Sequence, residues 1–131
     1  MARKSVLAIA FLLVACAHVA PIEQGVIADR LFCGQSIPGG GSVSEDEWNA
    51  FIREVVTPRF PDGLTIWSAE GQWRGADGTI VREPVRIIEI LHPFSSQFDT
   101  LIDEIAEEYK RRFRQEAVLR VTMPARMEFV E

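Results

Sequence analysis

Cysteine and histidine are scarce in this chain of 131 residues, which has two of each. The cysteines are Cys16 and Cys33, and the histidines are His18 and His92. They do not form the closely spaced pairs that bind zinc. The sequence therefore predicts neither a metal centre nor a bound cofactor.

Basic charge is also in short supply. The chain has 14 Lys and Arg residues against 19 Asp and Glu residues, which gives a formal net charge of −5. Proteins that bind nucleic acid need a basic surface, because the phosphates are negative. The acidic balance argues against nucleic acid as a partner, and equally against electrostatic attachment to anionic lipid.

No apolar stretch of the sequence is long enough to span a membrane, although a short one stands near its beginning. Residues 6–15 are ten apolar residues in a row, preceded by Arg3 and Lys4, whereas a membrane-spanning helix needs roughly 20. A short apolar run behind a positive segment is typical of a secretory signal peptide. We therefore interpret residues 1–15 as a signal peptide.

The end of this run, Leu13-Val14-Ala15-Cys16, resembles the cleavage and lipidation site of bacterial lipoproteins. Cleavage before Cys16 would leave its thiol to carry the lipid, and several acyl chains on one residue hold a protein stably on a bilayer. The alternative is ordinary secretion, with cleavage after Ala17 or Ala20. If Cys16 were retained in that case, a disulfide with Cys33 would become possible.

If Cys16 is lipidated, the residue that follows it indicates the localisation of the protein. Ala17, rather than Asp, follows the cysteine, which resembles lipoproteins destined for the outer membrane of Gram-negative bacteria. We expect the protein in the bacterial cell envelope, on the periplasmic side of that membrane, with the bilayer as its partner through the lipid. Loss of residues 1–15 removes Arg3 and Lys4, so the formal net charge falls from −5 to −7. Residues 16–25 lack periodicity, and we interpret them as a tether.

Residues 26–131 are enough for one domain that buries its own core. Hydrophobic periodicity and turn residues predict six main elements and a short edge strand in this part of the chain. The predicted strands are residues 26–33, 64–74, 79–91 and 118–123, with a short edge strand at 126–130, and the predicted helices are residues 44–57 and about 96–114.

Local signals support these boundaries. Ser44 and Glu47 form a capping box at the start of the first helix, and Pro58 disfavours helical geometry at the residue before it. We therefore expect that helix to end at residue 57. Asp77-Gly78 is a turn pair between the second and third strands.

The order β-α-β-β-α-β is the split βαβ arrangement of ferredoxin-like folds. It predicts an α+β domain with a four-stranded antiparallel sheet and two helices on one face, so that the other face is free. Alternation along the strands predicts Arg30, Phe32, Trp67 and Arg120 on the free face. It turns Leu119, Val121 and Met123 toward the helices, and it leaves the phase of the third strand open.

Aromatic and arginine side chains are enriched at interface hot spots. Their predicted presence on the free face favours a homodimer through that face. The alternative is that loops or the C-terminal segment of the chain cover it.

Three segments carry a resemblance to a known family. They are Thr57-Pro58-Arg59-Phe60-Pro61-Asp62-Gly63-Leu64-Thr65, Gly71-Gln72-Trp73-Arg74 and Ile80-Val81-Arg82-Glu83-Pro84. Together they resemble the domain of unknown function 3574 family of small, often lipid-anchored bacterial proteins, over about residues 29–129. Cys33 departs from the apolar or aromatic residue expected at its position. The resemblance implies one domain and carries no activity that can be transferred.

One group of residues could bind a ligand. Its members lie in and around the second and third strands, and they are Arg59, Trp73, Arg74, Arg82 and Glu83. Arginine offers paired donors to a carboxylate or phosphate, and tryptophan can stack on a ring or a cation. The alternative is that Arg59 and Arg82 pair with Asp62 and Glu83 and only stabilise the fold.

The sequence contains no catalytic motif. It has no Gly-x-Ser-x-Gly elbow, and glycines 39–41 lack the Lys-Ser/Thr ending of a phosphate-binding loop. These observations favour a lipid-anchored binding or interaction module of the envelope. One alternative is a small enzyme with its site at the sheet or dimer interface, using Arg59, Arg82, Glu83 or His92. Another is a structural envelope protein without a ligand.

Overall fold

The described part of the chain, residues 25–131 of a computed structural model, follows the predicted order of elements. The elements are β1 (Val26–Gly34), α1 (Glu45–Phe51), η1 (Ile52–Val56), α2 (Thr57–Arg59), β2 (Thr65–Arg74), β3 (Ile80–Pro93), α3 (Ser96–Phe113) and β4 (Leu119–Ala125). The predicted signal peptide 1–15, Cys16 and nearly all of the predicted tether lie outside the described residues. Within those residues, no helix is both long and apolar enough to cross a bilayer.

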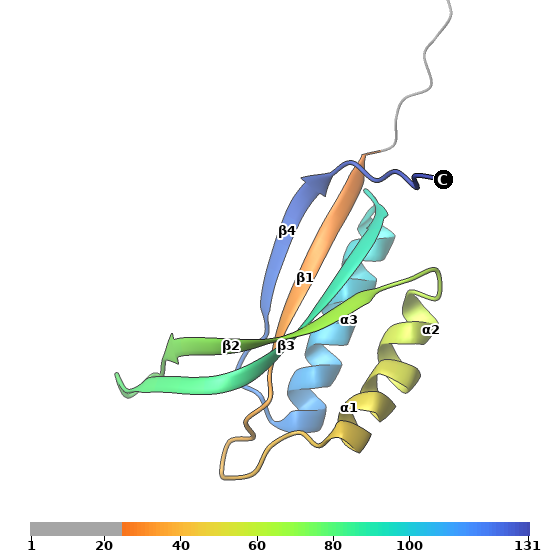
Figure 1. Cartoon of the computed structure of the whole chain (residues 1–131). Coiled ribbons are helices and arrows are strands. Elements are labelled where there is room, and N and C mark those ends of the chain that lie inside the picture. The colour runs from red at the N-terminus through yellow and green to blue at the C-terminus, as the bar shows by residue number, and fades with distance from the viewer. Residues whose placement is uncertain (1–24) are drawn as a thin grey trace, which may run out of the picture.

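The four strands form one antiparallel sheet in the order β2-β3-β1-β4. Both helical segments lie against the same face of this sheet (Figure 1). The arrangement is the predicted ferredoxin-like split βαβ fold. It leaves the opposite face of the sheet, which we call the free face, without a helix.

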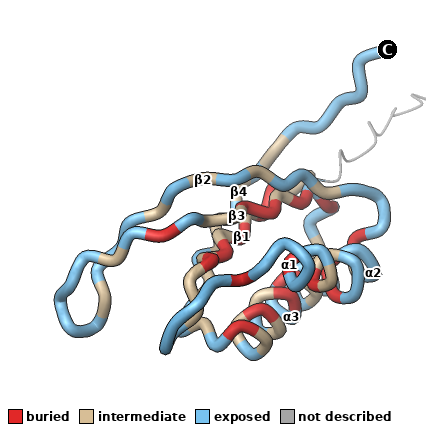
Figure 2. Tube along the Cα trace, turned by 60° about the horizontal axis from the view of Figure 1, so that its bottom comes forward, coloured by how far each residue is buried: buried red, intermediate tan, exposed pale blue. Residues whose placement is uncertain are grey.

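The core fills the space between the sheet and the helices, and buried residues gather there in Figure 2. Its largest side chains come from both helical segments and the two central strands. They are Leu31, Trp48, Phe51, Ile88, Ile90, Ile102, Ile105, Tyr109 and Phe113. The helical spacing of the apolar residues therefore predicted the covered face well.

The first helix begins as predicted and ends later. The Ser44 side chain accepts from the Glu47 N–H, and the Glu47 side chain accepts from the Ser44 N–H, which completes the capping box. The expected end at residue 57 is wrong, because α1 continues through η1 and α2 to Arg59. The Thr57 N–H bonds to the carbonyl of Ile52, five residues back. This wider π-type turn precedes Pro58, whose ring would clash with a carbonyl in a regular helix.

The last strand also differs from its prediction. It includes Pro124 and ends at Ala125, and residues 126–130 form no strand. Because β4 lies at the edge of the sheet, it tolerates a residue that cannot donate a ladder hydrogen bond.

The phase of β4 is the reverse of the expectation. Arg120 stands opposite Leu31 of β1, whose side chain belongs to the core, and it bonds to carboxylates on the helix side. Ion pairs with these carboxylates place Arg120 on the helix side, although the apolar residues that alternate with it favoured the opposite orientation of the strand. The apolar side chains of β4 therefore lie on the free face; they are Leu119, Val121 and Met123.

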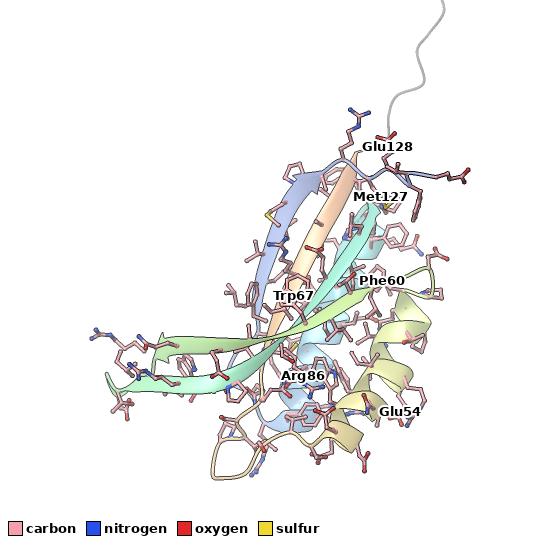
Figure 3. All side chains as sticks on the ribbon, in the orientation of Figure 1. Glu54, Phe60, Trp67, Arg86, Met127 and Glu128 are labelled. Atoms are coloured by element: carbon pink, nitrogen blue, oxygen red, sulfur yellow. The ribbon has the colours of Figure 1, made fainter. Side chains whose placement is uncertain are left out.

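The open question of phase in β3 is decided by its buried isoleucines. Ile88 and Ile90 belong to the core, and Arg86 points to the same side (Figure 3). Arg86 pairs with Glu45 of α1, and its guanidinium carbon lies 5.2 Å from the centre of the Trp48 ring. The alternate residues of β3 therefore lie on the free face; they are Val85, Ile87, Glu89 and Leu91.

Candidate functional site

The free face is mainly apolar across all four strands. The residues that the strand register places there include Ala28, Phe32, Trp67, Ala69, Val85, Ile87, Leu91, Leu119, Val121 and Met123. Leu119 is 60% exposed and Leu91 is 37% exposed. An exposed apolar surface of this kind marks an interaction site in soluble domains.

The C-terminal segment does not cover this face. After β4 the described chain runs away from the sheet (Figures 1 and 2). Its apolar side chains Phe129 and Val130 are 86% and 90% exposed. The alternative that this segment shields the free face is therefore not observed.

One ion pair lies in the middle of the free face. The Arg30 Nε lies 2.6 Å from the Glu89 Oε2, and the Arg30 guanidinium carbon is 5.6 Å from the centre of the Trp67 ring. Figure 3 shows Trp67 over the central part of the sheet. Arg30 and Trp67 thus lie on the predicted face, and Glu89 neutralises the charge of Arg30 within that face.

Part of the β2–β3 hairpin extends beyond the rest of the sheet. β1 pairs with Val85–Pro93 of β3, whereas the earlier part of β3 pairs only with β2. We call residues 70–84 the arm, and Figures 1 and 2 show it extending past β1. The turn at its end contains Gly78 with φ +85°, as Asp77-Gly78 predicted. A two-stranded hairpin by itself is only marginally stable.

Two of the predicted ligand-binding residues meet at the base of the arm. The Trp73 Nε1 donates to the Glu83 Oε1 over 2.9 Å, and the Ser36 N–H donates to the Oε2 over 2.9 Å. Glu83 is 8% exposed, while Trp73 is 43% exposed. A Cβ at Gly34 would lie 2.7 Å from the Glu83 Oε1. Any residue other than glycine at position 34 would displace the Glu83 carboxylate from its observed position.

The three predicted arginines lie elsewhere. Arg82 donates to the Gln72 Oε1 on the neighbouring strand of the arm. Alternation along the arm places Arg82 and Arg74 on the face opposite Trp73 and Glu83. Arg59 belongs to α2, where its Nε lies 3.0 Å from the Glu104 Oε2 of α3.

The structure therefore divides the predicted group in two. Trp73 and Glu83 form a direct contact, whereas Arg59 is held by the helical layer. The expected pairs of Arg59 with Asp62 and of Arg82 with Glu83 are not the observed contacts, which involve Glu104 and Gln72 instead. The residues of the enzyme alternative are also dispersed, because His92 belongs to a separate cluster.

That separate cluster surrounds Asp29, which is fully buried on the helix side of β1. Arg120 donates to both carboxylate oxygens over 2.8 and 2.9 Å, and Thr122 donates to one of them. The His92 Nε2 lies 2.8 Å from the Asp29 Oδ2. Arg120 also contacts the carboxylates of Asp99 and Asp103 on α3. The cluster thereby connects three strands with a helix.

These contacts set the charge of Asp29. Burial by itself raises the pKa of this carboxyl, but hydrogen bonds from Arg120, Thr122 and His92 hold the pKa below its ordinary value. The same contact with Asp29 raises the pKa of Arg120. With four donors on its two oxygens, Asp29 has no acceptor capacity left for a ligand. The cluster serves the fold rather than a binding site.

Sequence reasoning missed this cluster, although one signal was present. Asp29 and Arg30 interrupt an otherwise apolar strand, and an aspartate is rarely buried without a partner. Its partners come from distant parts of the chain, so periodicity could not identify them. His92, near the end of β3, is itself only 5% exposed.

The Cys33 thiol and the Tyr109 hydroxyl are both buried and unreactive. Cys33 is buried and free, and burial raises the pKa of its thiol. Burial also raises the pKa of Tyr109, whose hydroxyl donates to the Gly34 carbonyl over 2.7 Å. Neither group is poised to react.

Two shallow grooves lie outside the free face's centre. One of about 540 Å³ lies between α3 and the start of β4, and one of about 200 Å³ lies near Gln35, Ser68 and Arg86. Across residues 25–131, no three metal-ligating side chains converge.

Solved structures with a similar fold include a phage SAM lyase in complex with S-methyl-5'-thioadenosine. It is 19% identical, with 77% of this chain and 81% of that chain covered and a TM-score of 0.64. CutA from Synechococcus elongatus PCC7942 is 12% identical, with 78% of each chain covered and a TM-score of 0.53. CutA1 from Oryza sativa is 9% identical, with 80% and 84% covered and a TM-score of 0.55. At these identities the likeness concerns the fold.

A comparison with curated proteins finds no match. The family model described as "Protein of unknown function (DUF3574)" matches residues 28–129, which is nearly the range over which the sequence motifs resembled that family. The chain belongs to this family of proteins of unknown function.

Proposed function

We propose that this protein is a lipid-anchored interaction module of the bacterial cell envelope, and that it binds a second copy of itself through the free face. The observation that carries the proposal is the apolar character of the free face in all four strands, with Leu119 60% exposed. Such a surface is costly to leave in water, at about 25 cal/mol per Å² of apolar area.

The position of the anchor is compatible with this use. The described chain starts at Gly25, at the end of β1 that lies away from the arm (Figure 1). Cys16 precedes Gly25 by nine residues, a segment that spans at most roughly 30 Å when extended. A lipid on Cys16 would hold the domain near the bilayer and leave the arm pointing away from it.

Self-association is tested with the full chain in bacterial envelopes. Two forms carrying different C-terminal tags are expressed together, extracted in mild detergent and purified through one tag. We expect the second form to co-purify and the complex to sediment at twice the monomer mass or more. Leu119→Glu should abolish co-purification, whereas Phe94→Glu, at a residue that is 79% exposed beside the sheet, should not. A monomeric wild-type protein would contradict the proposal.

The anchor needs a separate test. Cells grown with labelled palmitate should incorporate the label into the wild-type chain and not into Cys16→Ser. An unlabelled wild-type chain, or release of the protein into the culture fluid, would show that the chain is not lipid-anchored.

A further inference from the structure

We infer that the end of the sheet next to the tether inserts apolar side chains into the bilayer. These side chains belong to Phe94, Met127, Phe129 and Val130, which we call the apolar tip. The inference rests on the proposed lipid anchor at Cys16 and adds a second point of contact with the same membrane. It begins from the place where the most exposed apolar side chains of the described chain lie.

Exposure of large apolar side chains is concentrated at the tip. Val130, Phe129 and Phe94 are 90%, 86% and 79% exposed, and no other large apolar residue among 25–131 reaches these values. Met127 is 49% exposed, and Leu119, the most exposed apolar residue of the free face, reaches 60%. Single exposed apolar residues are ordinary on soluble domains, whereas a group of them at one place marks an interaction surface.

The strand register brings the segments of the tip together. Val26 of β1 pairs with Pro93 of β3 and with Ala125 of β4. Phe94 directly follows Pro93, and the segment with the other three tip residues directly follows Ala125. The Phe94 N–H donates to the Gly25 carbonyl over 2.8 Å. Both segments therefore leave the sheet beside the start of β1, and Figure 1 shows the end of β4 at this end of the sheet.

The tether reaches the domain at the same end. Cys16 precedes Gly25 by nine residues, which span at most roughly 30 Å when extended. The other end of β3, at Ile80, is the first of 14 residues in that strand, so it lies roughly 45 Å from the tip at about 3.3 Å per residue. A lipid on Cys16 would hold the tip closer to the membrane surface than the arm.

A bilayer suits these side chains better than a protein surface does. They belong to segments outside the strands, and the chain after β4 runs away from the sheet (Figure 2). Neither of the two grooves described above is lined by a tip residue. Protruding apolar side chains need no complementary pocket in a bilayer, because surface-bound segments bury them about 5–10 Å deep, where headgroups meet acyl chains.

The expected contact is apolar rather than electrostatic. Arg126 and Glu128 form an exposed ion pair over 3.9 Å, and Glu131 is also exposed. One basic and two acidic residues give this segment no attraction to anionic lipid. A zwitterionic bilayer should therefore suffice, and the contact should persist in salt, since salt screens interactions between charges.

Two points of attachment would orient the domain on the membrane. The lipid holds the start of β1, and the tip holds the ends of β3 and β4, so the strands stand up from the surface. The free face then points sideways, toward another copy on the same bilayer. A two-fold axis along the membrane normal would bring two free faces together while both tips stay in the lipid.

A nitroxide label on the lipidated full-length chain tests the contact in vesicles of phosphatidylethanolamine and phosphatidylcholine. Phe94→Cys and Phe129→Cys each supply one labelling site, and Thr79→Cys, in the turn of the arm, supplies the control. The Cys33 thiol is buried and stays unlabelled, and the lipid would occupy Cys16. Collisions of the label with oxygen, which concentrates in the bilayer, are compared with collisions with a water-soluble nickel complex.

The ratio of oxygen to nickel collisions at positions 94 and 129 should exceed that at position 79 about fivefold or more, because insertion places the label below the headgroups. Val130→Glu should lower the ratio at position 129 about twofold or more, since a carboxylate is costly to bring into lipid. The matched control Ile80→Glu, at an arm residue that is 50% exposed, should leave that ratio unchanged. Equal ratios at the three labelled positions would overturn the inference.

The outcomes separate this inference from the proposed function. Labelled palmitate reports the anchor and co-purification from detergent reports self-association, and neither readout needs the tip to touch lipid. If both succeed while the tip labels contact only water, the proposed function stands and this inference is overturned. If Phe94→Glu or Val130→Glu reduces co-purification from detergent, the tip packs on a second copy, which also overturns it. A wild-type chain without palmitate would overturn the anchor and this inference together.

Discussion

The two faces of the sheet differ in a way that reverses the usual pattern. The covered face buries a charged cluster around Asp29, while the free face exposes apolar side chains such as Leu119. On the covered face, charge is stabilised by partners from the same chain. On the free face, no segment of residues 25–131 covers Leu119, which is 60% exposed. The contrast teaches that contacts within the chain satisfy the covered face, whereas the free face keeps apolar side chains exposed among residues 25–131.

The largest effect is expected where the covered face loses its central charge. Asp29→Ala leaves Arg120 and His92 without their buried partner, so the free energy of unfolding should fall by about 3–5 kcal/mol. Urea denaturation of the purified protein measures this loss. Asp62→Ala, at an exposed turn residue, should stay within about 0.5 kcal/mol. A loss below about 1 kcal/mol for Asp29→Ala would show that the cluster contributes little.

A smaller loss is expected at the base of the arm. Trp73→Phe removes the donor to the Glu83 Oε1, and hydrogen bonds to charged groups contribute about 1.5–3 kcal/mol. Trp67→Phe keeps an aromatic ring on the same strand and removes no such bond, so it is the matched comparison. Equal losses for the two variants in urea denaturation would argue against a stabilising role of the Trp73–Glu83 contact.

Acid should sharpen the same contrast. Folding lowers the pKa of Asp29 below its ordinary 3.8, so its contribution to stability is present above that value and is lost as the pH falls below it. Asp29→Asn removes this contribution at every pH. The difference in unfolding free energy between wild type and Asp29→Asn should therefore shrink between about pH 5 and about pH 2. A constant difference would contradict the assignment.

The smallest effect on the single chain is expected on the free face. Leu119→Glu should change the unfolding free energy of dilute protein by no more than about 0.5 kcal/mol. It should, however, remove the dependence of Tm on protein concentration that self-association gives the wild type. A wild-type Tm that does not rise with protein concentration would contradict self-association through the free face.

The sequence predicted the fold because each level of local signal agreed. The capping box at Ser44, the turn at Asp77-Gly78 and the apolar stripe of α3 all stand where expected. The phase of β4 was wrong because alternation treats Arg120 as a residue that seeks water. Its acidic partners lie on β1 and α3, and a pattern within one strand contains no information about them.

The sequence identified residues of the candidate site by their type, but it predicted only in part which of them lie together. Trp73 and Glu83 lie on facing strands of one hairpin, so a local signal sufficed to bring them together. Arg59 was grouped with them because it is near in sequence, but the helix extends through α2 and directs it to Glu104. The contact of Ser36 with Glu83 depends on the sheet order and has no sequence signature.

The π-type turn in η1 has a consequence for the register of the helix end. Its hydrogen bond spans five residues, one more than in a regular α-helix, and each residue turns a helix by about 100°. Deleting one residue between 52 and 56 would restore the regular spacing but swing Phe60 around the axis by that angle. Phe60 now packs against His92 and Phe98 (Figure 3). The wide turn thus sets the rotation of the helix end so that the Phe60 ring faces the sheet.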